Sequence, residues 1–194
     1  MNVPSALSEM LGNVARETAR MSYPGSMSRG KKPVVHKGTK AELEEYFAER
    51  FPLRQVWLSA SRLTATYESW HRARTEEIAN ALRQKVSKHN NGKAVVAKFL
   101  NTFMYQLMKY EPCRSLWPVL HLPLDGRVFA ALRQLKSSSL SAVQPLLFRS
   151  AYSLSYTEYL EIQRALWNLM HELNARPRAE FKLRSRIELN CLWI

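Results

Sequence analysis

Residues 89–110 read HNNGKAVVAKFLNTFMYQLMKY, and this stretch decides the class of the fold. Its first four residues, HNNG, have the composition of a tight turn. The remainder is strongly apolar and has the three- and four-residue spacing of a helix. We therefore expect a turn followed by a buried helix in the middle of the chain.

Helical spacing continues on both sides of this stretch. Apolar side chains follow it from Leu7 to Met21 and again over residues 61–88. A final helix is expected to end at Trp193. Only residues 33–35 suggest a short extended pairing, and no sheet is predicted. The pattern therefore predicts an all-α protein of about eight helices.

Local signals place several helix starts and connections. The stretches 39–42 and 155–158 match the capping box, and Asp125 stands where an N-cap is expected. Three prolines within 112–123 predict an extended connection, and the Ser-rich stretch 136–144 predicts a loop.

Composition limits the classes of function. The chain has 194 residues, 46% of them hydrophobic, which is enough for one domain with a core. Lys and Arg outnumber Asp and Glu by 29 to 16, a net charge of +13, which favours a polyanionic partner. Nucleic acid is the commonest such partner, and anionic lipid is the alternative. Anionic partners of this kind also predict a steep salt dependence of binding.

Several classes are disfavoured by what the sequence lacks. Two cysteines are too few for a four-cysteine site, and the five histidines show no ligand spacing, so we expect no metal and no cofactor. Charged residues interrupt every long apolar run and the N-terminal segment. We therefore expect neither a membrane span nor a signal peptide, and a cytoplasmic protein.

Two motifs follow one another in a suggestive order. Residues 89–100 read HNNGKAVVAKFL, and residues 122–132 read LPLDGRVFAAL. With the C-terminal run 159–193, they resemble the helix–hairpin–helix DNA glycosylases, most closely the archaeal 8-oxoguanine glycosylase branch. The resemblance extends over about 67–193. It implies a two-lobed all-α fold with a helix–hairpin–helix element and a central cleft.

The resemblance also implies an organisation for the whole chain. We expect one glycosylase-like domain over 1–194, with a basic loop at 22–38. A central lobe, 61–135, would carry the hairpin and the catalytic pair, and the N-terminal helices with 150–194 would form the other lobe. The implied partner is double-stranded DNA, so the protein would be associated with the nucleoid. We expect it to act as a monomer.

The implied catalytic residues are Lys93, which follows the turn, and Asp125, which lies 32 residues later. A lysine attacks the anomeric carbon of a sugar only as a neutral amine, and burial favours that form. The aspartate would stabilise the positive charge of the sugar and help to deprotonate the lysine. Lys98 is the rival nucleophile, but it lies about 1.4 helical turns later and on a different face. The alternatives are a solvated Lys93 and an Asp125 that only caps a helix.

The resemblance places a base pocket and several DNA contacts. Trp193 matches a tryptophan that stacks on the flipped base, although a core residue at the chain end is an equal alternative. The position of a second stacking aromatic falls on Ala97, with Phe99 two residues away, and the base-reading acid falls on Leu189, beside Glu188 and Asn190. Expected DNA contacts are Asn91, Gly92, Lys98 and Arg127, with further cations at Arg29, Lys31, Lys32, Lys37, Arg176, Arg178, Lys182, Arg184 and Arg186.

The sequence thus predicts a DNA glycosylase with lyase activity. Because the second aromatic is missing at Ala97, we expect a base other than 8-oxoguanine, such as a modified pyrimidine of phage DNA, and hence a role in defence. Two alternatives belong to other classes. One is a non-enzymatic basic helical DNA-binding protein, and the other is an interaction protein that binds RNA or another protein.

Overall fold

The computed structural model describes residues 5–22, 34–36, 38–82, 86, 91–176 and 182–192. Over these residues the chain is helical and contains no strand, which confirms the all-α class. The nearest approach to a sheet is an isolated antiparallel bridge between Val35 and Val86. None of the described helices is both long and apolar enough to cross a bilayer.

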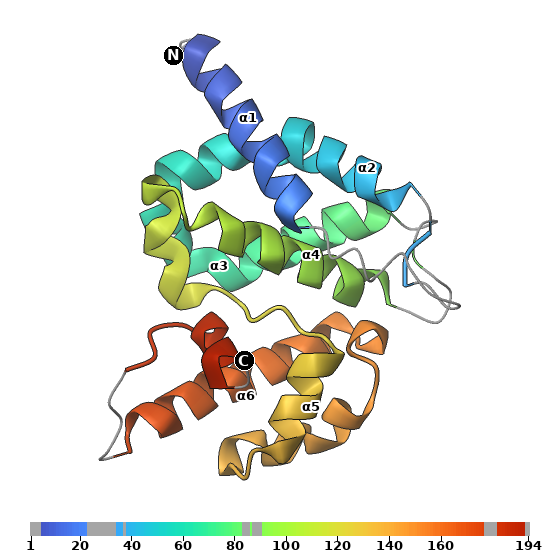
Figure 1. The fold of residues 1–194 in the computed structure, drawn as a ribbon, viewed down its shortest axis with the longest axis vertical. Coiled ribbons are helices and arrows are strands. Elements are labelled where there is room, and N and C mark those ends of the chain that lie inside the picture. The colour runs from blue at the N-terminus through green and yellow to red at the C-terminus, as the bar shows by residue number, and fades with distance from the viewer. Residues whose placement is uncertain are drawn as a thin grey trace.

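The first group of helices occupies the upper half of the molecule in Figure 1. Helix α4 (Gly92–Leu107) packs against α1 (Ser5–Ser22) and α3 (Leu53–Ala81). From Ala94 to Leu100 every residue of α4 is buried, as its apolar sequence predicts. The other elements of this group are α2 (Thr39–Glu45), the π-helical turn η2 (Tyr46–Arg50) and the 3₁₀ segment η3 (Glu111–Val119).

The second group occupies the lower half of Figure 1, and residues 120–125 run between the two groups as an extended segment. Helices α5 (Gly126–Gln134) and α6 (Tyr156–Asn174) both pack against the 3₁₀ segment η4 (Ser138–Phe148). Two shorter 3₁₀ segments complete it, η5 (Ala151–Ser153) and η6 (Arg186–Leu192).

Buried polar side chains join the two groups. On α4, the Asn101 amide nitrogen donates to the Tyr159 hydroxyl of α6 at 2.8 Å and to the carbonyl of Leu122 at 3.4 Å. Its oxygen accepts from His71 of α3 at 2.8 Å, and the Tyr159 hydroxyl lies 2.8 Å from Nδ1 of His121. Because these groups are buried, each needs its partner, and the network fixes α4 against the extended segment.

The extended segment is also held from the C-terminal side. Gln163 pairs with both backbone groups of Leu122, at 3.0 and 2.8 Å. Arg186 is only 8% exposed and donates to the carbonyls of Val119, Leu120 and Gln163. Residues 119–122 therefore have fixed hydrogen-bond partners in α6 and η6.

The local predictions have mixed outcomes. The capping box at Ser155 and Glu158 is present, and Asp125 is an N-cap. The box predicted at 39–42 is wrong: Gly38, at φ 95°, occupies the N-cap position, and the Thr39 hydroxyl donates to the carbonyl of His36. Glycine adopts this left-handed conformation without the steric cost of a side chain.

The boundaries of three other segments differ in part from the prediction. Helix α3 spans Leu53–Ala81, but its backbone is non-helical at Ser59, so a kink separates its first turns from the segment predicted to be helical from residue 61. The expected loop at 136–144 forms most of η4, and much of the expected extended connection forms η3. Apolar side chains in both stretches, such as Leu116 and Leu140, are buried, so packing overrides the local Ser and Pro signals.

Candidate functional site

Asp125 lies at the start of α5 and uses both carboxylate oxygens. Oδ1 accepts hydrogen bonds from the backbone amides of Arg127 and Val128, at 2.9 and 3.0 Å, which is the geometry of an N-cap. Oδ2 lies 2.9 Å from the Lys98 ammonium. Burial raises the pKa of Asp125, but the charge and hydrogen bond of Lys98 and the two amides outweigh it and lower this pKa.

Lys98 is a charged residue within the most apolar part of α4. Its side chain is 9% exposed, against 29% for Asp125. The ammonium donates to Asp125 and, at 3.0 Å, to the hydroxyl oxygen of Tyr152 in η5. A lysine is seldom buried to this extent unless its charge is paired, and here the Asp125 carboxylate provides the pairing.

The two groups of helices bring these three side chains together. Lys98 belongs to the first group and Tyr152 to the second, while Asp125 ends the extended segment as the N-cap of α5. Asn101 stands one turn after Lys98, and its partner Leu122 stands three residues before Asp125. The polar network at the junction therefore sets the position of α4 relative to Asp125, and with it the distance between amine and carboxylate.

The structure does not place Lys93 against Asp125. Lys93 is at the first turn of α4, its side chain is 43% exposed, and its ammonium pairs with Glu76 of α3 at 2.9 Å. The structure thus brings Asp125 to Lys98 and not to Lys93. Five residues turn a helix by about 140°, so Lys93 and Lys98 lie on different faces, and Lys98 is the one that reaches Asp125.

The predicted base pocket is not assembled from the residues named for it. Ala97 and Phe99 are 0% and 1% exposed, because both lie on core-facing sides of α4. They are core residues, and neither offers a face on which a base stacks. Trp193 lies outside the described residues, and the side chain of Asn190 is likewise not described.

Two of the predicted DNA contacts shape the start of α4. Asn91 is its N-cap, and the Asn91 side chain accepts from the Lys93 amide at 2.9 Å. The Asn91 amide donates to the carbonyl of Tyr152 at 2.6 Å, which ties η5 to the residue before Gly92. Arg127 is exposed at the first turn of α5, near Asp125.

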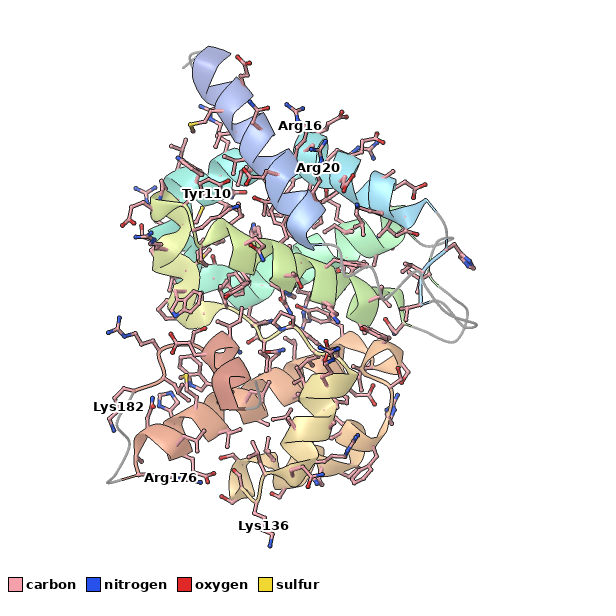
Figure 2. The ribbon with its side chains drawn as sticks, viewed as in Figure 1. Arg16, Arg20, Tyr110, Lys136, Arg176 and Lys182 are labelled. Carbon is pink, nitrogen blue, oxygen red and sulfur yellow. The ribbon has the colours of Figure 1, made fainter. Side chains whose placement is uncertain are left out.

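The cations of the surface are spread over the molecule. Figure 2 labels Arg16 and Arg20 on α1 and, at the opposite end, Lys136, Arg176 and Lys182. Charge alone therefore does not define one binding face. Arg184 is exposed, but Arg186 is buried against carbonyls and is corrected from a DNA contact to a structural residue. Outside the described residues lie Arg29, Lys31, Lys32, Lys37 and Arg178.

The Lys98–Asp125 pair has a defined chemical capacity. Once the ammonium has passed a proton to the carboxylate, the lysine amine is a nucleophile toward carbonyl and anomeric carbons. A molecule that covers the pair and removes water favours this transfer, because both charged forms lose their hydration. The site therefore suits chemistry that begins with an imine or a related carbon–nitrogen bond.

Sequence reasoning did not pair Lys98 with Asp125, although a signal for a partner of Lys98 exists. The run Ala94–Leu100 contains a single charged residue, and a charge within a buried helix requires a partner. Tyr152 had no such signal, because its contact with Lys98 spans 54 residues of chain.

Comparison with known proteins places this chain in no group, since no family model, curated protein or solved structure matches it. Among the described residues, no group of three or more His, Cys, Asp or Glu side chains is placed to hold a metal ion.

Proposed function

We propose that this protein is a DNA glycosylase with lyase activity, in which Lys98 is the nucleophile and Asp125 accepts its proton. The observation that carries the proposal is the ion pair between a nearly buried amine and a helix-capping carboxylate. The net charge of +13 supports a polyanionic substrate. The order of turn, lysine helix and Pro-Leu-Asp segment supports a helix–hairpin–helix glycosylase, with the nucleophile five residues later than the motif implies.

The proposed fold and reaction use both groups of helices. They form the two lobes, duplex DNA lies across them as substrate of a monomer, and the target nucleotide is flipped out of the stack to reach Lys98. Hydrophobic and polar contacts at the junction fix the two lobes relative to each other, so the Lys98 amine and the Asp125 carboxylate reach the same sugar.

The proposed chemistry begins with the transfer of a proton from Lys98 to Asp125. The amine then attacks C1′ of the sugar, and the C1′–N bond to the base breaks with its electron pair leaving on the base. The attacking nitrogen passes one proton to the base. Asp125 gives its proton to the ring oxygen as the C1′–O bond breaks, which leaves a protonated imine and an ionised Asp125. Asp125 then takes a proton from C2′ as the C3′–O bond breaks, and the 3′ phosphate leaves.

We assign the substrate to modified bases, with modified pyrimidines of phage DNA as the first class to test. The sequence carries alanine where the resembling branch stacks an aromatic on 8-oxoguanine, and Ala97 and Phe99 are both in the core. A site without an aromatic side chain on which the base stacks distinguishes 8-oxoguanine poorly from other bases. An enzyme of this specificity acts in defence against foreign DNA.

Borohydride trapping tests the nucleophile. The protein is mixed with duplex DNA that carries an abasic site, and borohydride reduces any imine to a stable amine adduct. We expect an adduct with the wild type and none with Lys98→Gln. For Asp125→Asn we expect trapping slower by about 10²–10⁴-fold, the usual loss when a proton acceptor is removed.

Lys93→Gln is the matched control, because it makes the same substitution on the same helix five residues earlier. It should trap DNA as the wild type does, and circular dichroism should show that all variants keep their helices. Loss of the adduct in Lys93→Gln with retention in Lys98→Gln would return the nucleophile to Lys93. If neither adduct nor released base forms while salt-sensitive binding persists, the protein is a non-enzymatic DNA-binding protein.

Mass spectrometry of released bases tests the substrate. Genomic DNA from phages with modified cytosines is compared with a duplex that contains 8-oxoguanine. We expect release of the modified pyrimidine, and efficient release of 8-oxoguanine would contradict the assignment. A strong preference for RNA over duplex DNA would instead favour an RNA-binding role.

A further inference from the structure

Tyr152 contacts both the Lys98 amine and the start of the helix that carries it. Its hydroxyl oxygen accepts from Nζ of Lys98 at 3.0 Å, and Nζ lies 5.5 Å from the centre of its ring. Its backbone carbonyl accepts from the amide of Asn91, the N-cap of α4, at 2.6 Å. Tyr152 is therefore connected to α4 at two points.

The two acceptors of Lys98 differ in how they respond to proton transfer. Once Asp125 has taken the proton, the ion pair is gone and its attraction for the amine is largely lost. The phenol oxygen of Tyr152 is a neutral acceptor, so it still accepts a hydrogen bond from the neutral amine. A lysine side chain has many rotamers, and without such a bond the amine would leave the position of attack.

We propose that Tyr152 is a positioning residue, whose hydroxyl oxygen holds the Lys98 amine in place for attack after Asp125 has accepted the proton. This inference rests on the proposed function, which supplies the attack. The contact itself involves only protein atoms, so it is testable with a small aldehyde as well as with DNA.

Tyr152→Phe removes the acceptor and keeps the ring. We expect the maximal rate of imine formation to fall about 10-fold, because the amine is held less well in the reactive geometry. We also expect the loss to persist across the pH range of the measurement, because the bond to Tyr152 is needed after the proton has left the amine. Affinity for DNA should not change, since Tyr152 acts through Lys98.

Two measurements are made across pH on the full chain, with wild type, Tyr152→Phe and Tyr110→Phe. One is single-turnover borohydride trapping on abasic duplex. The other is reductive methylation by formaldehyde, quantified at Lys98 by peptide mass spectrometry with Lys93 as the internal reference. Tyr110, labelled in Figure 2, is the matched control, because its hydroxyl contacts a charged group elsewhere, Glu17 at 3.2 Å.

The titratable groups that contact the Lys98 side chain in the described residues are Asp125 and Tyr152. An unchanged rate at Lys98 in Tyr152→Phe across the pH range would overturn the inference, as would the same loss in Tyr110→Phe. The two proposals can also fail separately. If the wild type traps no DNA, but Tyr152→Phe alone lowers the rate of methylation at Lys98, the glycosylase proposal fails while the positioning of the amine by Tyr152 is supported.

Discussion

At the scale of single residues, Asp125 combines a structural role with a chemical one. One oxygen caps α5 and the other pairs with Lys98. A substitution at this position therefore removes either the ion pair alone or both the ion pair and the cap. Asparagine keeps an oxygen for the helix amides and loses the charge, whereas alanine loses both.

We expect Asp125→Ala to lower the free energy of unfolding by about 2–4 kcal/mol, the sum of a lost cap and an ammonium left without its carboxylate. Asp125→Asn should cost less, because its cap remains. Urea unfolding at about pH 7 measures both. Equal losses for the two variants would show that the cap contributes nothing.

The difference in the free energy of unfolding between the wild type and Asp125→Asn should also depend on pH. Because the folded-state pKa of Asp125 is lowered, the charged carboxylate stabilises the fold above about pH 4, the pKa of an unfolded aspartate. This contribution is lost as the pH falls through the lower, folded-state pKa. The stability gap should therefore narrow at acid pH, and a constant gap would contradict the lowered pKa.

The residues also show where sequence reasoning succeeds. Asp125 as an N-cap was predictable, because capping depends on the residues that follow directly. The pairing of Asp125 with Lys98 rather than Lys93 was not, because it depends on how α4 lies against residues 120–125. That arrangement is set by Asn101 and Gln163, whose partners are 21 and 41 residues away.

At the scale of the elements, glycines at two helix starts differ in conformation. Gly38 precedes α2 with φ 95°, whereas Gly126 opens α5 without a positive φ. A Cβ added at either position would meet nothing within 4 Å, so space does not distinguish them. Only the backbone conformation does.

We expect Gly38→Ala to destabilise the protein by about 1 kcal/mol, because an L-residue is strained in the left-handed region. Gly126→Ala should be neutral or stabilise by up to about 1 kcal/mol, because alanine restricts the unfolded chain. Thermal unfolding of the two variants compares them directly. A stabilised Gly38→Ala would contradict the conformation of this turn.

The elements also show why some boundaries could not be predicted. Residues 136–144 are rich in serine, yet η4 forms there and buries Leu140 and Val143 against its neighbours. Tertiary packing overrides the conformational preference of individual residues most easily in short segments, because few backbone hydrogen bonds form there. The apolar period of α4 was long enough for its burial to be predicted.

At the scale of the whole molecule, two buried histidines connect the groups of helices. Burial lowers the pKa of His71 to about 4, and it also holds the pKa of His121 well below the usual range, beside His71 and Arg186. The Asn101 oxygen accepts from Nε2 of His71, so in the neutral ring Nδ1 accepts from the hydroxyl of Tyr156.

We expect the protein to lose stability on acidification. Unfolded histidine binds a proton near pH 6.5, but folded His71 does not until about pH 4, so the unfolded state binds more protons between these values. The free energy of unfolding should fall by about 2 kcal/mol through His71 alone from about pH 7 to about pH 5. Urea unfolding at both pH values provides the measurement.

His71→Gln is the control for this effect, because glutamine does not titrate. The variant is less stable at neutral pH, but its loss between the two pH values should be smaller than that of the wild type by about 2 kcal/mol. The same loss in both proteins would show that His71 does not contribute to the acid sensitivity.

The buried Arg186 has a consequence for the order in which the protein is completed during synthesis. Lys98, Asp125 and Tyr152 have all been synthesised by residue 152, but the guanidinium that holds residues 119 and 120 belongs to residue 186. A ribosome makes the chain from its N-terminus, so this part of the junction stays open until residue 186 has emerged. A nascent chain therefore carries Lys98, Asp125 and Tyr152 before Arg186 can fix residues 119 and 120, and the junction between the two groups of helices is completed only after these three side chains have been made.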